Sequence, residues 1–168
     1  DEGVDGRLLH VLTSPSTVVA SELADIGWTV ESLIEKVARA NPPLHALIDT
    51  GALVTGMTNE QVARALLAVE GGLPGMEGVV FLDDSDRQMI LLRAGGRVLP
   101  LRQASVSMRR RFTFFDQVHT TGMDIKQVLD ASALVTLGKD MTFRDFAQGS
   151  YRMRGIGQGL SLIHISEP

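Results

Sequence analysis

The sequence predicts an α/β fold in which helices flank a mainly parallel β-sheet. Short apolar runs with strand character alternate along the chain with segments of helical spacing, and this alternation is typical of such folds. The core strands are expected at residues 44–49, 78–82, 112–115 and 133–137. In sheets of this type, ligands meet the loops at the carboxyl ends of the strands. We therefore expect any ligand at the loops of residues 49–57, 116–126 and 138–142.

Capping signals predict the helices between these strands. Thr58 is followed three residues later by Gln61, which is the pattern of a capping box that opens a helix. Apolar residues then recur at helical spacing, at Val62, Leu66 and Val69. Start and stop signals of the same kind place the other helices at residues 15–26, from Thr29 to the prolines at 42 and 43, and from Thr142 onward.

A β-hairpin inserted in the sheet is expected at residues 88–101, where arms rich in β-forming residues flank Gly95-Gly96. The acidic residues before it, Asp83, Asp84 and Asp86, resemble a metal-binding turn only weakly. A turn that enters the hairpin explains them without a metal. No His, Asp or Glu spacing in the chain indicates zinc, and we expect no metal site made by this chain alone.

The composition is that of an ordinary globular protein. Of the 168 residues, 44% are apolar and 21% are charged, and the formal net charge is −4, which argues against a broadly basic surface for nucleic acid. The chain has no cysteine, so it has no disulfide, thiolate metal site or cysteine nucleophile. The absence of cysteine favours an intracellular, cytoplasmic protein, with the nucleus as the alternative compartment. No apolar run has the length of a membrane span, so we expect no membrane partner.

Three regions are predicted along the chain. Residues 1–43 form a helical or linker-like lead-in, and residues 44–159 form the main domain. Residues 160–168 read LSLIHISEP, which looks like the translation of a sequencing adapter and is left out of the predicted fold. Because the chain starts Asp1-Glu2-Gly3 without methionine, we interpret it as a fragment of a longer parent chain.

The strongest functional pattern lies in two segments, one that continues from the end of the third core strand and one that begins with the fourth core strand. They read FDQVHTTGMDIK at residues 115–126 and ALVTLGKDMTFRDFAQGSYRMRGIG at residues 133–157. Gly122 lets backbone amides approach a ligand closely, and Asp124 can fix the loop by accepting hydrogen bonds. Gln148 and Arg152 are four residues apart, so on a helix both side chains can point into one cleft.

These segments resemble the last two motifs of superfamily-two helicases and of the bacterial preprotein translocase motor. The resemblance implies a RecA-like fold of the second-lobe type of P-loop NTPases. It also implies ATP with Mg²⁺, bound at the interface with an upstream RecA-like lobe of the same parent chain. The residues that match nucleotide-binding positions are Gly122, Asp124, Lys126 and Gln148. The match to a catalytic arginine that acts in trans is Arg152 or Arg154.

The choice between these two arginines stays open. The helicase pattern has a further arginine where this chain has Gly155, and Arg154 is the nearest substitute. The alternative is that both arginines form structural ion pairs on a solvated helix. The chain also lacks a GxxxxGK[ST] phosphate loop, because Gly138-Lys139 is followed by Asp140. The phosphate-binding lobe is therefore expected upstream of Asp1.

Residues 45–159 are also similar to a eukaryotic family of very long proteins labelled ubiquitin thioesterases or ubiquitinyl hydrolases. The shared segments are IDTGALVTGM, GVVFLDD, FDQVHTTGMDIK, LVTLGKDMTFRDFAQG and YRMRGIGQG. The label implies a hydrolase that removes ubiquitin, with ubiquitin or a ubiquitinated protein as partner. Because this chain has no cysteine, thiol chemistry would have to lie elsewhere in the parent. The alternative is a non-catalytic interaction module of a deubiquitinase that no longer turns over ATP.

Two weaker candidates remain. Asp116 and His119 are close enough in sequence to interact, but no nucleophile accompanies them, so a hydrolytic triad is not expected. Arg109-Arg110-Arg111, with Arg102 nearby, form the basic cluster of the chain. A contact with nucleic acid or an acidic partner is one interpretation, and the favoured one is a solvated run of charge.

Overall fold

Eight strands and two α-helices are present in the part of the chain that the computed structural model describes, which is residues 20–22, 29–49, 51–116, 131–136 and 160–164. The helices are α1 (Val30–Ala38) and α2 (Asn59–Ala68). The strands are β1 (Ala20–Glu22), β2 (Ala46–Ile48), β3 (Gly78–Leu82), β4 (Gln88–Leu92), β5 (Val98–Pro100), β6 (Arg111–Phe115), β7 (Ala133–Val135) and β8 (Leu160–His164). Two short 3₁₀ helices, η1 (Leu101–Gln103) and η2 (Met108–Arg110), lie between β5 and β6.

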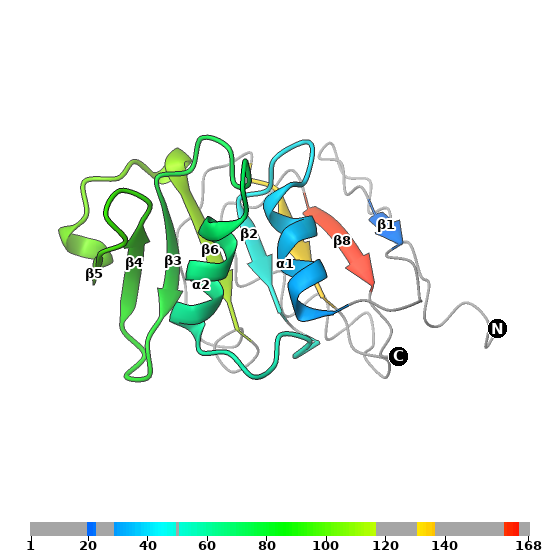
Figure 1. The fold of residues 1–168 in the computed structure, drawn as a ribbon, viewed down its shortest axis with the longest axis horizontal. Helices are drawn as coiled ribbons and strands as arrows, with labels where there is room; N and C mark the ends of the chain where they lie inside the picture. The colour runs from blue at the N-terminus through cyan, green and yellow to red at the C-terminus, as the bar shows by residue number, and fades with distance from the viewer. Residues whose placement is uncertain (1–19, 23–28, 50, 117–130, 137–159, 165–168) are drawn as a thin grey trace.

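The strands form one mixed sheet in the order β1-β8-β7-β2-β6-β3-β4-β5. All neighbours from β1 to β3 pair in parallel, whereas β3, β4 and β5 pair antiparallel. Both helices lie against the same face of the sheet (Figure 1). The predicted α/β class with helices against a largely parallel sheet is therefore confirmed. The finer assignment to a RecA-like fold stays a prediction.

Both helices begin where the capping signals predict. Thr58 accepts from the amide of Gln61 at 3.2 Å, and the side chain of Gln61 accepts from the amide of Thr58 at 2.8 Å. Thr29 and Ser32 form the same reciprocal pair at the start of α1. These caps satisfy amides that the first turn of each helix leaves without an internal partner.

The predicted helix at residues 15–26 is wrong for its middle part. Ala20–Glu22 form β1, which pairs in parallel with β8 at the end of the sheet. Hydrogen bonding to a distant strand here overrides a local helix signal. Leu160–His164, which we left out of the predicted fold, form β8 between β1 and β7. Their origin in an adapter stays a prediction, as does the division into three regions.

The central strands are buried on both faces, as parallel strands in α/β proteins usually are. Leu47, Val79 and Phe114 face the helices and join their apolar residues in one core cluster. On the other face, Ile48 and Phe115 belong to a second cluster. The stretch from β4 to η2 covers part of that face with the half-buried side chains of Leu92, Leu99, Leu101, Ala104 and Val106.

The antiparallel edge is formed by two successive turns. The predicted hairpin at residues 88–101 is confirmed as β4 and β5, with positive φ at Gly95 and Gly96. The turn before it joins β3 to β4 and is held by Asp83, whose carboxylate accepts from the amides of Ser85 and Arg87, each at 2.9 Å. Because short turns join β3 to β4 and β4 to β5, these three strands pair antiparallel, and the sheet is mixed.

Candidate functional site

The carboxyl ends of three neighbouring parallel strands lie level with one another. In the register of the sheet, Ile48 of β2 is paired with Phe115 of β6 on one side and with Val135 of β7 on the other. The next residue of each strand is therefore at the same edge: Asp49, Asp116 and Thr136. This is the edge at which ligands bind in open α/β sheets, and it agrees with the expected position of a site.

The buried carboxylate of Asp49 holds neighbouring backbone in place and is not exposed to bind a ligand. Its side chain is 2% exposed. Its Oδ1 accepts from the amide of Leu53 at 2.9 Å and from the hydroxyl of Thr136 at 2.5 Å, while Oδ2 accepts from the amide of Val54 at 2.9 Å. The amide of Gly51 adds a bond to the hydroxyl of Thr136 at 3.1 Å. Asp49 thus fixes the loop of residues 51–57 to the end of β7.

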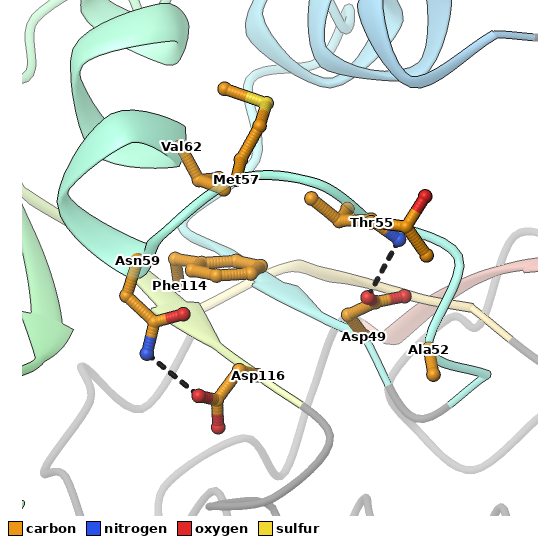
Figure 2. A pocket seen from close by; sticks show the side chains of 9 residues that line it. Asp49, Ala52, Thr55, Met57, Asn59, Val62, Phe114 and Asp116 are labelled. Carbon is orange, nitrogen blue, oxygen red and sulfur yellow. Dashed lines mark hydrogen bonds between the residues drawn. The ribbon is translucent and has the colours of Figure 1, made fainter. Parts of the chain in front are cut away.

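Asn59, the first residue of α2, joins the ends of two further strands. Its Nδ2 donates to the carbonyl of Leu82 at the end of β3, at 2.9 Å, and to Oδ2 of Asp116 at 2.7 Å. Both amide hydrogens are used, so the remaining polar atom, Oδ1, is an acceptor. In Figure 2 the amide nitrogen of Asn59 is directed at Asp116 and its oxygen is directed away from it.

A cavity of about 220 Å³ lies between these two anchors (Figure 2). Its apolar wall is made by Phe114 of β6, Val62 of α2, and Val54 and Met57 of the loop before α2. The other lining residues are Asp49, Ala52, Thr55, Asn59 and Asp116. Among the nine described lining residues, two carry carboxylates, Asp49 and Asp116, so the described part of the cavity combines an apolar wall with acidic groups.

The start of α2 favours a carboxylate at this place. The amino end of a helix has a partial positive charge, and Asn59 in its first turn bonds directly to Asp116. Asp116 is half-buried. Asp116 follows β6 directly, and its carboxylate is held by Asn59 at the start of α2.

The predicted site residues all lie outside the described residues. These are Gly122, Asp124, Lys126, Gln148, Arg152 and Arg154, together with His119 of the weaker pair. Their predicted roles stay predictions. Gly122, Asp124, Lys126 and His119 follow β6 in the sequence. Gln148 and the two arginines follow β7, and both strands end at the edge just described.

The sequence predictions give no site role to Asp49 or Asn59. Asp49 is only the last residue of the strand expected at 44–49, and Asn59 only lies between Thr58 and Gln61 of the expected capping box. The signal that identifies Asp49 together with Asp116 is a polar residue directly after each of two buried strands, because parallel strands place such residues side by side. Asn59, at the start of α2, gives no such signal. Thr136 gives no such signal, since threonine is common inside strands.

The basic cluster makes local contacts. Arg110 pairs with Glu77 at 3.7 Å, and Arg111 donates from Nε to the carbonyl of Val106 at 2.9 Å. Arg102 and Arg109 are exposed on η1 and η2. These contacts fit the favoured interpretation of a mostly solvated run of charge, and a partner for the cluster stays untested.

No family model, curated protein or solved structure matches this chain. Across the described ranges, no three His, Cys, Asp or Glu side chains are grouped so that they could hold a metal ion. Within the same ranges, neither α-helix has the length and apolar character needed to cross a membrane.

Proposed function

We propose that this chain is the second RecA-like lobe of a helicase- or translocase-type ATPase. It binds ATP with Mg²⁺ at an interface with an upstream phosphate-loop lobe of the same parent chain. The observation that supports this proposal best is the level edge formed by Asp49, Asp116 and Thr136. Both motif-bearing segments include that edge, because one continues from the end of β6 and the other contains β7 and continues from its end.

The acidic rim limits what the nucleotide can contact. A triphosphate would meet the carboxylate of Asp116 at the cavity, which is unfavourable for like charges. We therefore assign the phosphates to the downstream segments, where Lys126 and Arg152 or Arg154 supply positive charge. Gly122, Asp124 and Gln148 complete the nucleotide-facing set. An arginine contributed in trans stabilises the charge that develops during phosphoryl transfer.

One experiment tests the catalytic arginine in the full-length parent protein. ATP hydrolysis is measured for the unaltered protein, for Arg152→Ala and Arg154→Ala separately and together, and for Arg102→Ala as a surface control. Loss of a trans-acting arginine lowers kcat by about 10³–10⁵-fold. We expect this loss for one single variant and for the double variant, with the control unchanged. Full activity in the double variant would contradict the assignment.

A second candidate follows from Gly155, which stands where the helicase pattern has arginine. In this alternative the same fold is a non-catalytic interaction module in a ubiquitinyl hydrolase, and the parent no longer turns over ATP. An active-site-directed ubiquitin probe distinguishes the two. Labelling of the full-length parent, together with no ATP hydrolysis, would favour the alternative, whereas ATP hydrolysis without labelling would favour the motor.

A further inference from the structure

Ser105 lies in a short extended stretch that connects the two 3₁₀ helices. Residues 104–107 follow η1, precede η2 and belong to no helix or strand. Ala104 and Ser107, at the two ends of the stretch, have extended backbone angles, with ψ values of 139° and 152°. Side chains of an extended chain point alternately to opposite sides. The stretch is therefore expected to have an inner and an outer row of side chains.

The burial of the four residues follows this alternation. Ala104 and Val106 are half-buried and pack against the cluster on the sheet face opposite the helices. Ser105 and Ser107 are both exposed. The two packed neighbours of Ser105 hold the stretch on the sheet, and the hydroxyl-bearing side chain stands on the solvent side. The fold therefore presents Ser105 on an extended, accessible stretch of backbone.

The charged residues around Ser105 in the sequence all have the same sign. Residues 87–111 contain no Asp, Glu or Lys, although the chain as a whole has a net charge of −4. They contain seven arginines, which are Arg87, Arg93, Arg97, Arg102, Arg109, Arg110 and Arg111. Arg102 precedes Ser105 by three residues and is exposed on η1. An arginine at a fixed distance before an exposed hydroxyl is a charge pattern of the kind by which protein kinases select substrates.

We propose that Ser105 is a phosphorylation site for an arginine-directed serine/threonine protein kinase. Oγ of Ser105 forms a bond to the γ-phosphorus of ATP while the bond from that phosphorus to the β,γ-bridging oxygen breaks, so that ADP leaves. The hydroxyl proton passes to the catalytic carboxylate of the kinase. Arg102 pairs with acidic side chains of the kinase. The site is built from residues 101–107 and their packing, so it can fail or hold independently of the proposed ATPase function.

Ser107 is the matched comparison within the same stretch. It is exposed like Ser105, but it begins η2, and its carbonyl accepts from the amide of Arg110 at 3.0 Å. The residue three positions before it is Ala104, so it lacks the preceding arginine that Ser105 has. The proposal therefore assigns the phosphate to Ser105 and not to Ser107.

Phosphorylation of the folded 168-residue chain tests the inference directly. The chain is incubated with Mg²⁺, ATP and an arginine-directed kinase well below its unfolding temperature, and fragment mass spectrometry locates the phosphate. A synthetic peptide of residues 99–111 is the reference for the sequence without the fold. We expect phosphate on Ser105 in both. Phosphate on the peptide alone, or on neither, would overturn the inference, because the folded surface would then not present Ser105 to the kinase.

Two pairs of variants locate the site. Ser105→Ala should abolish the phosphate that Ser107→Ala leaves in place. Arg102→Gln should lower kcat/KM of the kinase for the chain at least about tenfold, the loss typical of one charge-assisted hydrogen bond, whereas Arg97→Gln, at an exposed position of the hairpin, should leave it unchanged. Thermal unfolding confirms that the variants fold. Phosphate that persists in Ser105→Ala at the original stoichiometry, or equal kcat/KM for Arg102→Gln and the unaltered chain, would overturn the assignment.

Discussion

The hydroxyl of Thr136 donates to the carboxylate of Asp49 at 2.5 Å, which ties the end of β7 to the end of β2. The same Asp49 oxygen accepts from the amide of Leu53 in the loop that leads to α2. A buried polar group of this kind is costly when it loses a partner. The bond therefore couples the loop that lines the cavity to the strand from which the predicted arginine segment continues.

Thr136→Val and Asp49→Asn test this coupling. Thr136→Val keeps the shape but removes one donor to Asp49, and we expect a loss of about 1–2 kcal/mol in the free energy of unfolding. Asp49→Asn places an amide group against backbone donors and should cost about 2–3 kcal/mol. In a double-mutant cycle followed by urea unfolding, the coupling energy should exceed about 0.5 kcal/mol. Additive losses would show that the two side chains act independently.

Thr55→Val is the matched control for that cycle. Thr55 lies in the same loop but is exposed. Surface substitutions of this kind usually change stability by less than about 0.5 kcal/mol. A loss at Thr55 as large as that at Thr136 would mean that the whole loop is sensitive to substitution, and the Asp49–Thr136 bond would not explain the result.

The sequence predicts the elements of this fold better than it predicts the site. Capping boxes at Thr29 and Thr58 are local, so the two helix starts follow from residues three positions apart. The strand at Ala20–Glu22 depends on a partner more than a hundred residues away, and no local pattern reports it. The cavity is not predicted by local patterns either, because Asn59 and Asp116 become neighbours only after β3, β6 and α2 have packed.

Arg93 is expected to stabilise the turn after α2. Its guanidinium donates to three backbone carbonyls, those of Met76 and Leu73 at 2.9 Å and that of Gly72 at 3.2 Å. Leu73 has a φ of 47°, which is unfavourable for a branched apolar residue. The bonds from Arg93 offset this strain while Leu73 inserts into the core with 2% exposure.

We expect Arg93→Lys to lower the free energy of unfolding by about 1–2 kcal/mol, because one ammonium group cannot match three carbonyls in the geometry of a planar guanidinium. Equilibrium urea unfolding measures the change. Arg97→Lys, at an exposed position of the neighbouring hairpin, is the control and should be neutral. If Arg93→Lys were as stable as the unaltered chain, the turn would be held by the burial of Leu73 alone.

Gly78 is required at the start of β3 because of close packing. A Cβ atom built there would lie 2.8 Å from the carbonyl oxygen of Leu91 and 2.9 Å from Cδ1 of Ile90. Gly78→Ala should therefore destabilise the chain by about 1–3 kcal/mol. Adding Ile90→Val removes the contact with Cδ1 but leaves a γ carbon at residue 90 and the carbonyl of Leu91, so we expect no rescue in thermal unfolding. Full rescue would show that the side chain of Ile90, and not the backbone of β4, limits the space.

The carboxylate of Asp83 is expected to stabilise the β3–β4 turn at neutral pH and to lose this effect in acid. Burial would raise the pKa of Asp83, but hydrogen bonds from the amides of Arg87 and Ser85 and from the Arg87 side chain outweigh it, so the pKa lies below its ordinary value of 3.8. A carboxyl group with a lowered folded pKa stabilises the fold above the unfolded value and loses this effect as pH falls through the folded value. Asp83→Asn should therefore lower the Tm at pH 7, and the difference from the unaltered chain should shrink below about pH 4. Asp84→Asn, at an exposed neighbouring position in the same turn, is the control and should leave the Tm at pH 7 unchanged. A Tm difference for Asp83→Asn that stays constant between pH 7 and pH 3 would contradict the electrostatic explanation and leave only the shape of the turn.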